Sequence, residues 1–237
     1  LVLSLALLLT MMPTGGIVAS AQSTGSGQCG DTAYWDITDN VLTISGTGPI
    51  YHYDYIGDYI PDYAAYASTI QRIVIEDGIT EIGNEAFESF DDYGSEYVYS
   101  TLTEIRIPNT VNKIGVNAFA GSTSIETIHL PASVDTLGMQ AFAGCSALTN
   151  ITVEAGNTAF ASVGGVLFTA DGTGLIAYPI GRTVPEYTIP STVKKIWPCA
   201  FLCEEDLQKV YFNEGLEIIA DAAFNSCDNL NEVYLPS

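Results

Sequence analysis

Residue types able to carry catalysis or metal binding are few in this chain, and they are scattered. The only two histidines, His52 and His129, do not stand in a metal-ligand spacing such as His-Glu-x-x-His. A Cys-His dyad or a Ser-His-Asp triad would need one of them. His129 falls in an outward column of an expected strand and His52 lies among tyrosines, so we expect surface or packing roles. The sequence therefore predicts no enzymatic activity and no cofactor.

Five cysteines are the other reactive side chains. Cys145 and Cys227 each follow a recurring phenylalanine by three residues, which is typical of a small residue in a core layer. In other units the same slot holds Ser122 and Glu204. Cys199-x-x-x-Cys203 leaves a disulfide or half of a metal site open, but no second nearby pair completes a zinc site. An odd count leaves at least one thiol unpaired or intermolecular in an exported protein.

Tyrosines are concentrated between Tyr51 and Tyr99, which holds nine of the 14. Tyrosine combines a rigid apolar ring with a polar tip, so one interpretation is a recognition patch for protein or sugar. The other interpretation is a solvent-facing cap and loop. Asp54, Asp58 and Asp62 lie in the same segment, but their spacing is not that of an EF-hand loop. We expect no metal there.

The net charge of the chain restricts the classes of partner that it can bind. The 237 residues carry 28 Asp and Glu against 7 Lys and Arg, a formal net charge of −21. Nucleic-acid binding needs basic side chains to displace phosphate counterions, and this chain cannot supply them. An anionic membrane surface is disfavoured for the same reason. Basic proteins, cations and neutral sugars remain open as partners.

The elements that must position any site come from an internal repeat with a period of 23. One unit reads Leu102-Thr-Glu-Ile105-Arg-Ile107-Pro108 and continues to Ala118-Phe119. The next unit repeats each apolar position one such step later and ends at Ala141-Phe142. The same step separates Phe201 from Phe224. A repeat of this length predicts stacked units, because no single unit can bury its own apolar face.

Two units are longer than the rest. Phe87 and Phe119 are 32 residues apart, which is one repeat step plus nine residues. The additional residues fall in the polar segment Glu88–Ser100, so we expect a surface loop there. Phe142 to Phe201 spans 59, which is two steps plus 13. That excess coincides with two apolar runs around Asp171-Gly172, so we expect a β-hairpin insertion at about 157–180.

The pattern within a unit predicts a repeat solenoid of the leucine-rich-repeat type. It would be mostly β, with short helical or 3-10 turns and a parallel sheet. Ile105 and Ile107 alternate as a half-buried strand requires, and Pro108 ends that strand. A glycine that marks the second corner of the unit recurs, as at Gly115 and Gly138, although Trp197 takes its place in one unit. A β-helix, which repeats a similar strand-and-turn unit, is the nearest alternative.

The motif Leu-x-x-Ile-x-Ile-Pro-x-x-Val-x-x-Ile-Gly-x-x-Ala-Phe-x-x-Cys resembles the BspA-like leucine-rich-repeat family over roughly residues 70–237. The insertion from Asn157 to Phe168 resembles one that is common in that family, and Cys29 to Gly48 resembles its amino-terminal cap. The resemblance implies a secreted or surface-exposed protein that adheres to host extracellular-matrix proteins or to other cells. The family has no shared catalytic residues to carry over.

Domain organisation follows from these observations and from the ends of the chain. Leu1–Leu9 is apolar but too short to span a bilayer, and Ala19-Ser20-Ala21 is a signal-peptidase pattern. We expect a signal peptide at 1–21 without its n-region, a cap at 22–69 and the repeat array at 70–237. After signal cleavage we expect no membrane insertion. The last unit stops partway, so we expect the native protein to continue.

The predicted binding site is the outward face of the repeat strands, because solenoids use such extended faces for recognition. One outward column comprises Val74, Arg106, His129, Thr152, Thr188, Tyr211 and Tyr234. The neighbouring column comprises Arg72, Glu104, Thr127, Asn150, Glu186, Lys209 and Glu232. Their mixed chemistry suits a protein partner, with a glycan as the second possibility. The competing hypothesis is a structural spacer that displays another domain encoded beyond residue 237.

Overall fold

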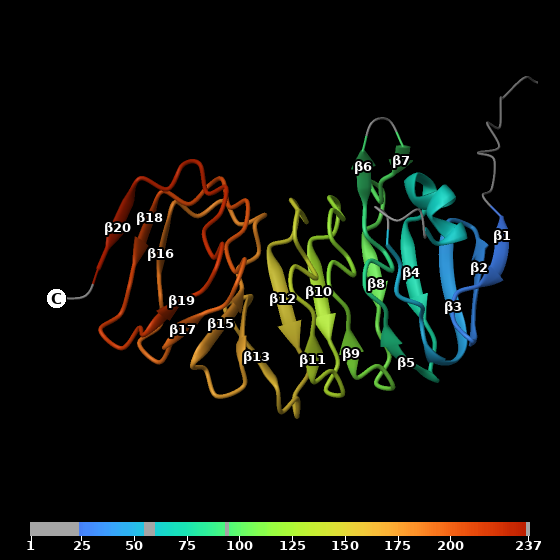
Figure 1. The fold of residues 1–237 in the computed structure, drawn as a ribbon, viewed down its shortest axis with the longest axis horizontal. Coiled ribbons are helices and arrows are strands. Elements are labelled where there is room, and N and C mark those ends of the chain that lie inside the picture. The colour runs from blue at the N-terminus through green and yellow to red at the C-terminus, as the bar shows by residue number, and fades with distance from the viewer. Residues whose placement is uncertain (1–23, 55–59, 93–94, 236–237) are drawn as a thin grey trace, which may run out of the picture.

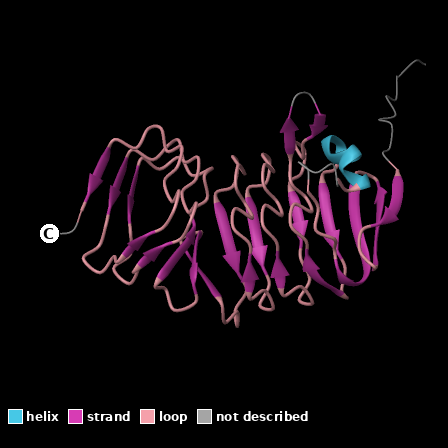
Figure 2. Ribbon diagram, in the orientation of Figure 1, coloured by secondary structure: helices cyan, strands magenta, loops and turns pink. Residues whose placement is uncertain are grey.

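The computed structural model describes residues 24–54, 60–92 and 95–235, and of residues 90–92 and 95–97 it describes only the backbone. The expected signal peptide lies outside these ranges. The regular secondary structure of the described residues is almost all strand, with a single 3-10 helix, η1 (Asp62–Thr69), and no closed barrel (Figure 2). Within the same ranges, no helix has both the length and the apolar character needed to cross a bilayer.

The amino-terminal end is an antiparallel sheet of three strands, β1 (Gly25–Gln28), β2 (Thr32–Thr38) and β3 (Val41–Pro49). β2 alternates exposed and buried positions, as a strand with one covered face must. Asp39 and Asn40 form the β2–β3 turn with positive φ angles of 53° and 62°. This is a conformation that Asn and Asp tolerate better than most residues. The first half of β3 pairs in parallel with β4 and its end pairs with β5, so one strand starts both faces of the array.

Each repeat unit then contributes two strands, which lie on two faces (Figure 1). We call the outward side of the first set the main face. Its strands are β4 (Arg72–Ile75), β8 (Glu104–Arg106), β10 (Thr127–Leu130), β12 (Asn150–Val153), β16 (Glu186–Thr188), β18 (Lys209–Tyr211) and β20 (Glu232–Tyr234). The second face has β5 (Ile79–Ile82), β9 (Lys113–Ile114), β11 (Thr136–Leu137), β15 (Gly174–Ala177), β17 (Lys195–Ile196) and β19 (Ile218–Ile219).

Strand pairing follows the repeat. Thr127 lies opposite Asn150 and Lys209 opposite Glu232, each pair one repeat step apart in a parallel ladder. Arg72 lies opposite Glu104, across the longer step. The extra residues of that longer unit include the hairpin of β6 (Phe90–Asp92) and β7 (Ser95–Tyr97), which projects from the array in Figure 1.

A column of aromatic rings runs through the core. Phe119 is fully buried and lies between Phe87, at a centroid distance of 5.4 Å, and Phe142, at 6.2 Å. The Phe119 N–H donates to the Ala141 carbonyl of the next unit, so the small residue before each phenylalanine lets the turns stack closely. A second column of rings runs through Tyr178, Phe201 and Phe224.

The insertion divides the array between these two columns. β13 (Phe160–Val163) and β14 (Val166–Thr169) form an antiparallel meander with β15, and Gly172 turns the chain between β14 and β15. On the main face, β12 is the last strand of one sheet and β16 the first of another; on the second face, no ladder joins β11 to β15 in the described chain. The predicted main face is therefore not one continuous sheet: no ladder joins β8 to β10 in the described chain, and between β12 and β16 the inserted strands occupy the edge that the next unit would have used.

Candidate binding face and an apolar cavity

The carboxyl-terminal part of the main face carries a row of alternating charge. The Lys209 ammonium lies 3.6 Å from a carboxylate oxygen of Glu186 and 3.4 Å from one of Glu232. Parallel pairing places these side chains in register, since Glu186, Lys209 and Glu232 are successive partners on β16, β18 and β20. The hydrogen bond and charge of Glu232 raise the pKa of Lys209, so the ammonium stays protonated at neutral pH.

Beside that row lies a pair of stacked tyrosines. The rings of Tyr211 and Tyr234 are 4.5 Å apart at an angle of 10°, and Tyr234 is 43% exposed. The Tyr211 hydroxyl donates to Glu186 at 3.4 Å, and the Tyr234 hydroxyl donates to Glu232. Those bonds hold both rings in place, and the bond from Tyr234 lowers the pKa of Glu232. Thr188, on β16, lies in the same column and is exposed.

The other predicted residues lie on the amino-terminal part of the main face. Glu104 forms an ion pair with Arg72, with Nε and Oε2 2.9 Å apart. His129 Nδ1 lies 2.9 Å from the Thr152 hydroxyl on the adjacent strand. Arg106 is exposed on β8. The 14 residues of the two outward columns therefore fall into two groups, eight on β4–β12 and six on β16–β20, separated by the insertion.

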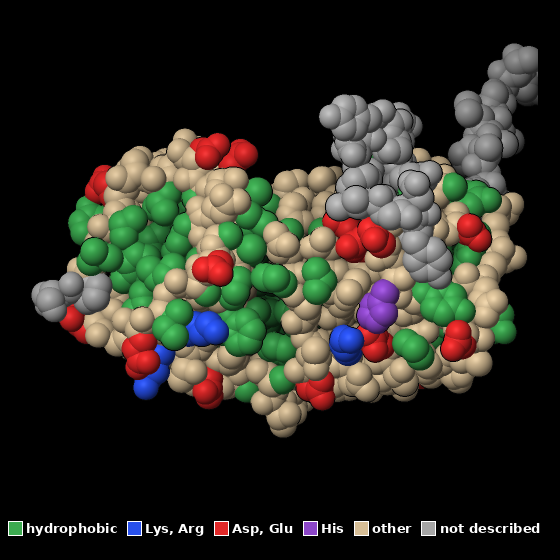
Figure 3. All heavy atoms as spheres, in the orientation of Figure 1, with side chains coloured by type: hydrophobic (Ala, Val, Ile, Leu, Met, Phe, Trp, Pro, Cys, Tyr) green, Lys and Arg blue, Asp and Glu red, His purple; other side chains and the backbone are tan. Residues whose placement is uncertain are grey.

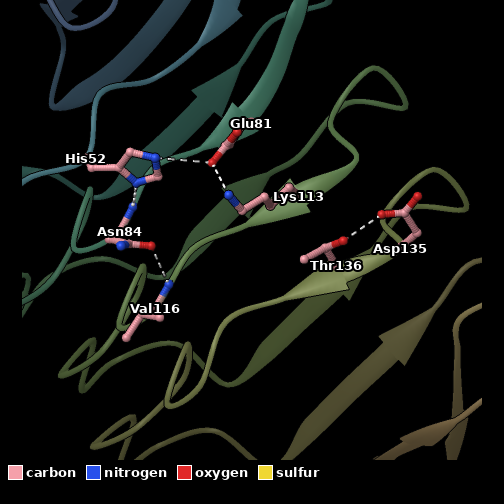
Figure 4. A network of polar contacts seen from close by, with 7 residues as sticks. All are labelled: His52, Glu81, Asn84, Lys113, Val116, Asp135 and Thr136. Carbon is pink, nitrogen blue, oxygen red and sulfur yellow. Dashed lines mark hydrogen bonds and ion pairs between the residues drawn. The ribbon is translucent and has the colours of Figure 1, made fainter.

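His52 is a structural residue on the second face (Figure 4). Its Nδ1 accepts a hydrogen bond from the Asn84 N–H at 2.9 Å, and its Nε2 lies 3.4 Å from Glu81. Glu81 also lies 2.7 Å from the Lys113 ammonium. The imidazole thus links the cap to the first repeat unit, and Glu81 extends the contact to Lys113 of the second unit.

The tyrosine-rich segment is largely core where its side chains are described. Tyr63 and Tyr99 are completely buried and Tyr53 is 7% exposed. Tyr63 begins the first column of rings, 5.7 Å from Phe87, and its hydroxyl donates to the Ala86 carbonyl at 2.7 Å. A recognition patch made of these three rings is therefore wrong, because they pack inward beneath the cap. Tyr55, Tyr59, Tyr93 and Tyr97 lie where side chains are not described.

A cavity of about 290 Å³ lies where the array is divided. Its wall combines the turn at residues 137–143 with residues 176–180 of the insertion and the segment 195–202. Phe142 and Tyr178, the adjacent ends of the two columns of rings, both line it. Figure 3 shows a hollow with hydrophobic side chains near the middle of the face drawn there. The long step from Phe142 to Phe201 and Trp197 in the glycine column were the sequence signals for this feature.

Trp197 fits because Gly174 precedes it by one unit. A Cβ atom at Gly174 would lie 2.6 Å from Nε1 of Trp197, so only glycine leaves room for the indole. By contrast, Gly138, in the usual corner position, lies directly on the backbone of the unit before it. In the Trp197 unit, therefore, the glycine that makes room for the corner residue is Gly174, one unit earlier.

Comparison with protein families gives a match to the BspA type leucine rich repeat region, in six copies over residues 94–168 and 181–237. These ranges cover more than half of the chain. The protein belongs to the BspA-type leucine-rich-repeat family. The gap between the two matched ranges contains the β14–β15 turn and all of β15.

Solved structures of other bacterial leucine-rich-repeat proteins share this BspA-type fold. A leucine-rich repeat protein from Eubacterium ventriosum has 24% identity and a TM-score of 0.58, with 89% of this chain and 68% of that chain covered. The pneumococcal vaccine antigen PcpA has 23% identity and a TM-score of 0.58, with coverage of 90% and 70%. A leucine rich cell surface protein from Faecalibacterium prausnitzii has 21% identity and a TM-score of 0.54, with coverage of 90% and 77%. Comparison with curated proteins gave no match.

Two cysteines of the BspA-type units, Cys145 and Cys227, pack against the core. Cys145 is fully buried and its thiol donates to the Phe119 carbonyl of the preceding unit at 3.3 Å; Cys227 does the same to Phe201 at 3.0 Å. Burial raises the pKa of Cys145 to about 12, so its thiol stays protonated. Cys199 and Cys203 are both free, and the described residues contain no cluster of three metal-ligating side chains.

Glu204 occupies the same repeat position as Cys145 and Cys227. Its side chain is completely buried, and Oε1 accepts a hydrogen bond from the Asp206 N–H at 3.1 Å. Among the described residues, Oε2 has no hydrogen-bond partner. Burial, followed by the nearby charge of Asp206, raises the pKa of Glu204 to about 7. The sequence showed only that a carboxylate stood where the repeat has Ser or Cys.

Proposed function

We propose that this is an exported, surface-exposed BspA-type protein that binds a protein partner through the main face of β16, β18 and β20. The stacked pair Tyr211 and Tyr234 is the observation that supports this most strongly. Tyrosines held rigidly at a surface lose little conformational entropy on binding and are enriched at the energetic centres of interfaces. A cell surface protein and a vaccine antigen among the structural neighbours support the proposed location.

The chemistry of this face defines the class of partner. Lys209 lies between Glu186 and Glu232, so the row has net negative charge and presents carboxylate oxygens beside two aromatic rings. A partner with exposed basic and apolar side chains complements that arrangement. We propose a host extracellular-matrix or cell-surface protein, with a glycan stacking on the tyrosines as the alternative. The chain's net charge of −21 opposes nucleic acid as the partner.

The test is a binding screen of the mature chain against immobilised matrix proteins and a glycan array, followed by two double variants. Tyr211→Ala with Tyr234→Ala should weaken binding by about 30-fold or more, the effect of losing a central aromatic contact. His129→Ala with Thr152→Ala removes an equally exposed polar pair from the other part of the main face and should leave affinity unchanged. Unchanged affinity in the tyrosine variant would eliminate the proposed face. Absence of any ligand would favour the spacer hypothesis.

A further inference from the structure

The cavity between the two parts of the array has aromatic and apolar walls. Phe142 presents one ring face to Phe119 and contributes to the cavity wall. Met139 and Trp197 stand at the rim, where they are 51% and 39% exposed. Large apolar side chains left exposed around a concave surface are typical of a ligand site. The volume of about 290 Å³ lies at the small end of the range for such sites, roughly 300–1,000 Å³.

The backbone explains why the cavity stays open. In the units on either side, the N–H of the ring-bearing residue donates to the next unit: Phe119 to Ala141, and Tyr178 to Ala200. Among the described residues, the Phe142 N–H makes no such bond. The two parts are instead joined by other backbone bonds at the cavity wall, where the Ile151 N–H donates to Gly165 and the Gly181 N–H to Leu148. The array is thus closed along one edge and open along the other.

Lys195 is the only Lys or Arg among the lining residues, and Arg182 lies over the Tyr178 ring, 5.4 Å from its centre. Lys195 lines the cavity, and its ammonium lies 4.9 Å from the centre of the Trp197 ring. Its neighbour Lys194 is paired with Glu217, whereas no carboxylate lies within ion-pair distance of Lys195 among the described residues. In a chain with 28 acidic residues and seven basic ones, an ammonium without a carboxylate partner beside an apolar cavity favours an anionic group on the ligand.

We propose that the cavity binds a small amphipathic acid. Its flat apolar body would lie between Phe142, Tyr178 and Trp197, and its acidic group would meet the ammonium of Lys195. The aromatic walls select a planar body, since offset stacking and edge contacts favour rings over branched chains. This site is independent of the main face.

Two dyes that differ by one charged group provide the test. The probe 8-anilinonaphthalene-1-sulfonate carries a sulfonate, and N-phenyl-1-naphthylamine has the same rings without it. Energy transfer from tryptophan reports binding, and Trp35→Phe leaves Trp197 as the only donor. Both dyes should quench Trp197, with the sulfonate dye binding about fivefold more tightly, the size of a partly exposed ion pair.

Variants separate this site from other apolar surfaces. Lys195→Met should remove the fivefold advantage and leave the neutral dye unaffected, whereas Lys194→Met should change neither. Ala143→Phe and Ala177→Leu, which fill the cavity from opposite walls, should each abolish quenching while circular dichroism stays unchanged. Ile219→Ser tests the exposed apolar surface near the carboxyl-terminal end and should leave quenching intact. Absence of Trp197 quenching, or quenching that survives both filling variants, would overturn the proposal.

Discussion

Replacing Phe119 with alanine should destabilise the protein far more than the same change at Phe224. Phe119 is fully buried with stacked rings on both sides, at 5.4 and 6.2 Å. Phe224 is half-buried; it stacks on Phe201 at 4.6 Å and touches Phe212 edge-on. Both changes delete the same atoms, so the difference between them measures burial and stacking alone.

The structure sets the size of that difference. Truncation of a buried phenylalanine costs about 3–5 kcal/mol, and each stacked neighbour adds roughly 0.5–1.5 kcal/mol beyond area burial. We expect Phe119→Ala to cost about 5 kcal/mol, because its cavity is closed on both sides. Phe224→Ala should cost about 2 kcal/mol, because solvent can enter the space it leaves and only part of the ring is withdrawn from water.

Urea denaturation supplies the assay. Trp35 lies in the core of the cap and Trp197 in the carboxyl-terminal part, so single-tryptophan backgrounds report the two parts separately. Phe119→Ala should lower the midpoint seen by Trp35, and Phe224→Ala should act mainly on the one seen by Trp197. Equal losses for the two variants would refute the inference that the column of rings is a buried, stacked core.

Two further changes test other parts of the structure. Gly138→Ala should lower the free energy of unfolding by about 2–3 kcal/mol in the same assay, because the new Cβ would lie 2.2 Å from the Val116 nitrogen. Ala220→Gly, at the equivalent corner position of another unit, is the control and should have a small effect. Equal effects of the two changes would contradict close stacking of the units. The pKa of Glu204 is about 7 in the folded protein, against about 4.5 in the unfolded chain, so the free energy of unfolding falls as pH rises between those values. Glu204→Gln should therefore raise the free energy of unfolding above pH 7 and make it depend less on pH. Glu88, whose pKa burial also raises to about 7, contributes in the same direction and remains in that variant; a profile unchanged by Glu204→Gln would show that Glu204 is not responsible.

The repeat was readable from the sequence because stacking imposes the same chemistry at each step. Ile128 and Ile151 face the core one repeat step apart, and Thr127 pairs with Asn150, because a parallel ladder keeps equivalent residues in register. The hairpin turn was readable as well, since Asp171-Gly172 marks it locally and Gly172 adopts a positive φ of 71°. These features depend only on neighbours in sequence or on the repeat itself.

The division of the array was not readable, because an insertion in a repeat can loop out or separate the stack, and only strand pairing decides which. The burial of Tyr63 and Tyr99 could not be predicted from the sequence either. A tyrosine suits a surface or a core whose edge can accept its hydroxyl, and composition does not distinguish the two. Tyr63 precedes Phe87 by little more than one repeat step, and that spacing was the signal for its place in the column of rings.

The existence of the cavity depends on the break between β11 and β15 on the second face. Amide hydrogen exchange, resolved residue by residue by NMR, tests it directly. The Phe119 and Tyr178 amides donate across the stack and should be strongly protected, whereas the Phe142 amide should exchange rapidly. Protection of Phe142 equal to that of Phe119 would show that the turns stack continuously through the insertion, and it would contradict the open cavity.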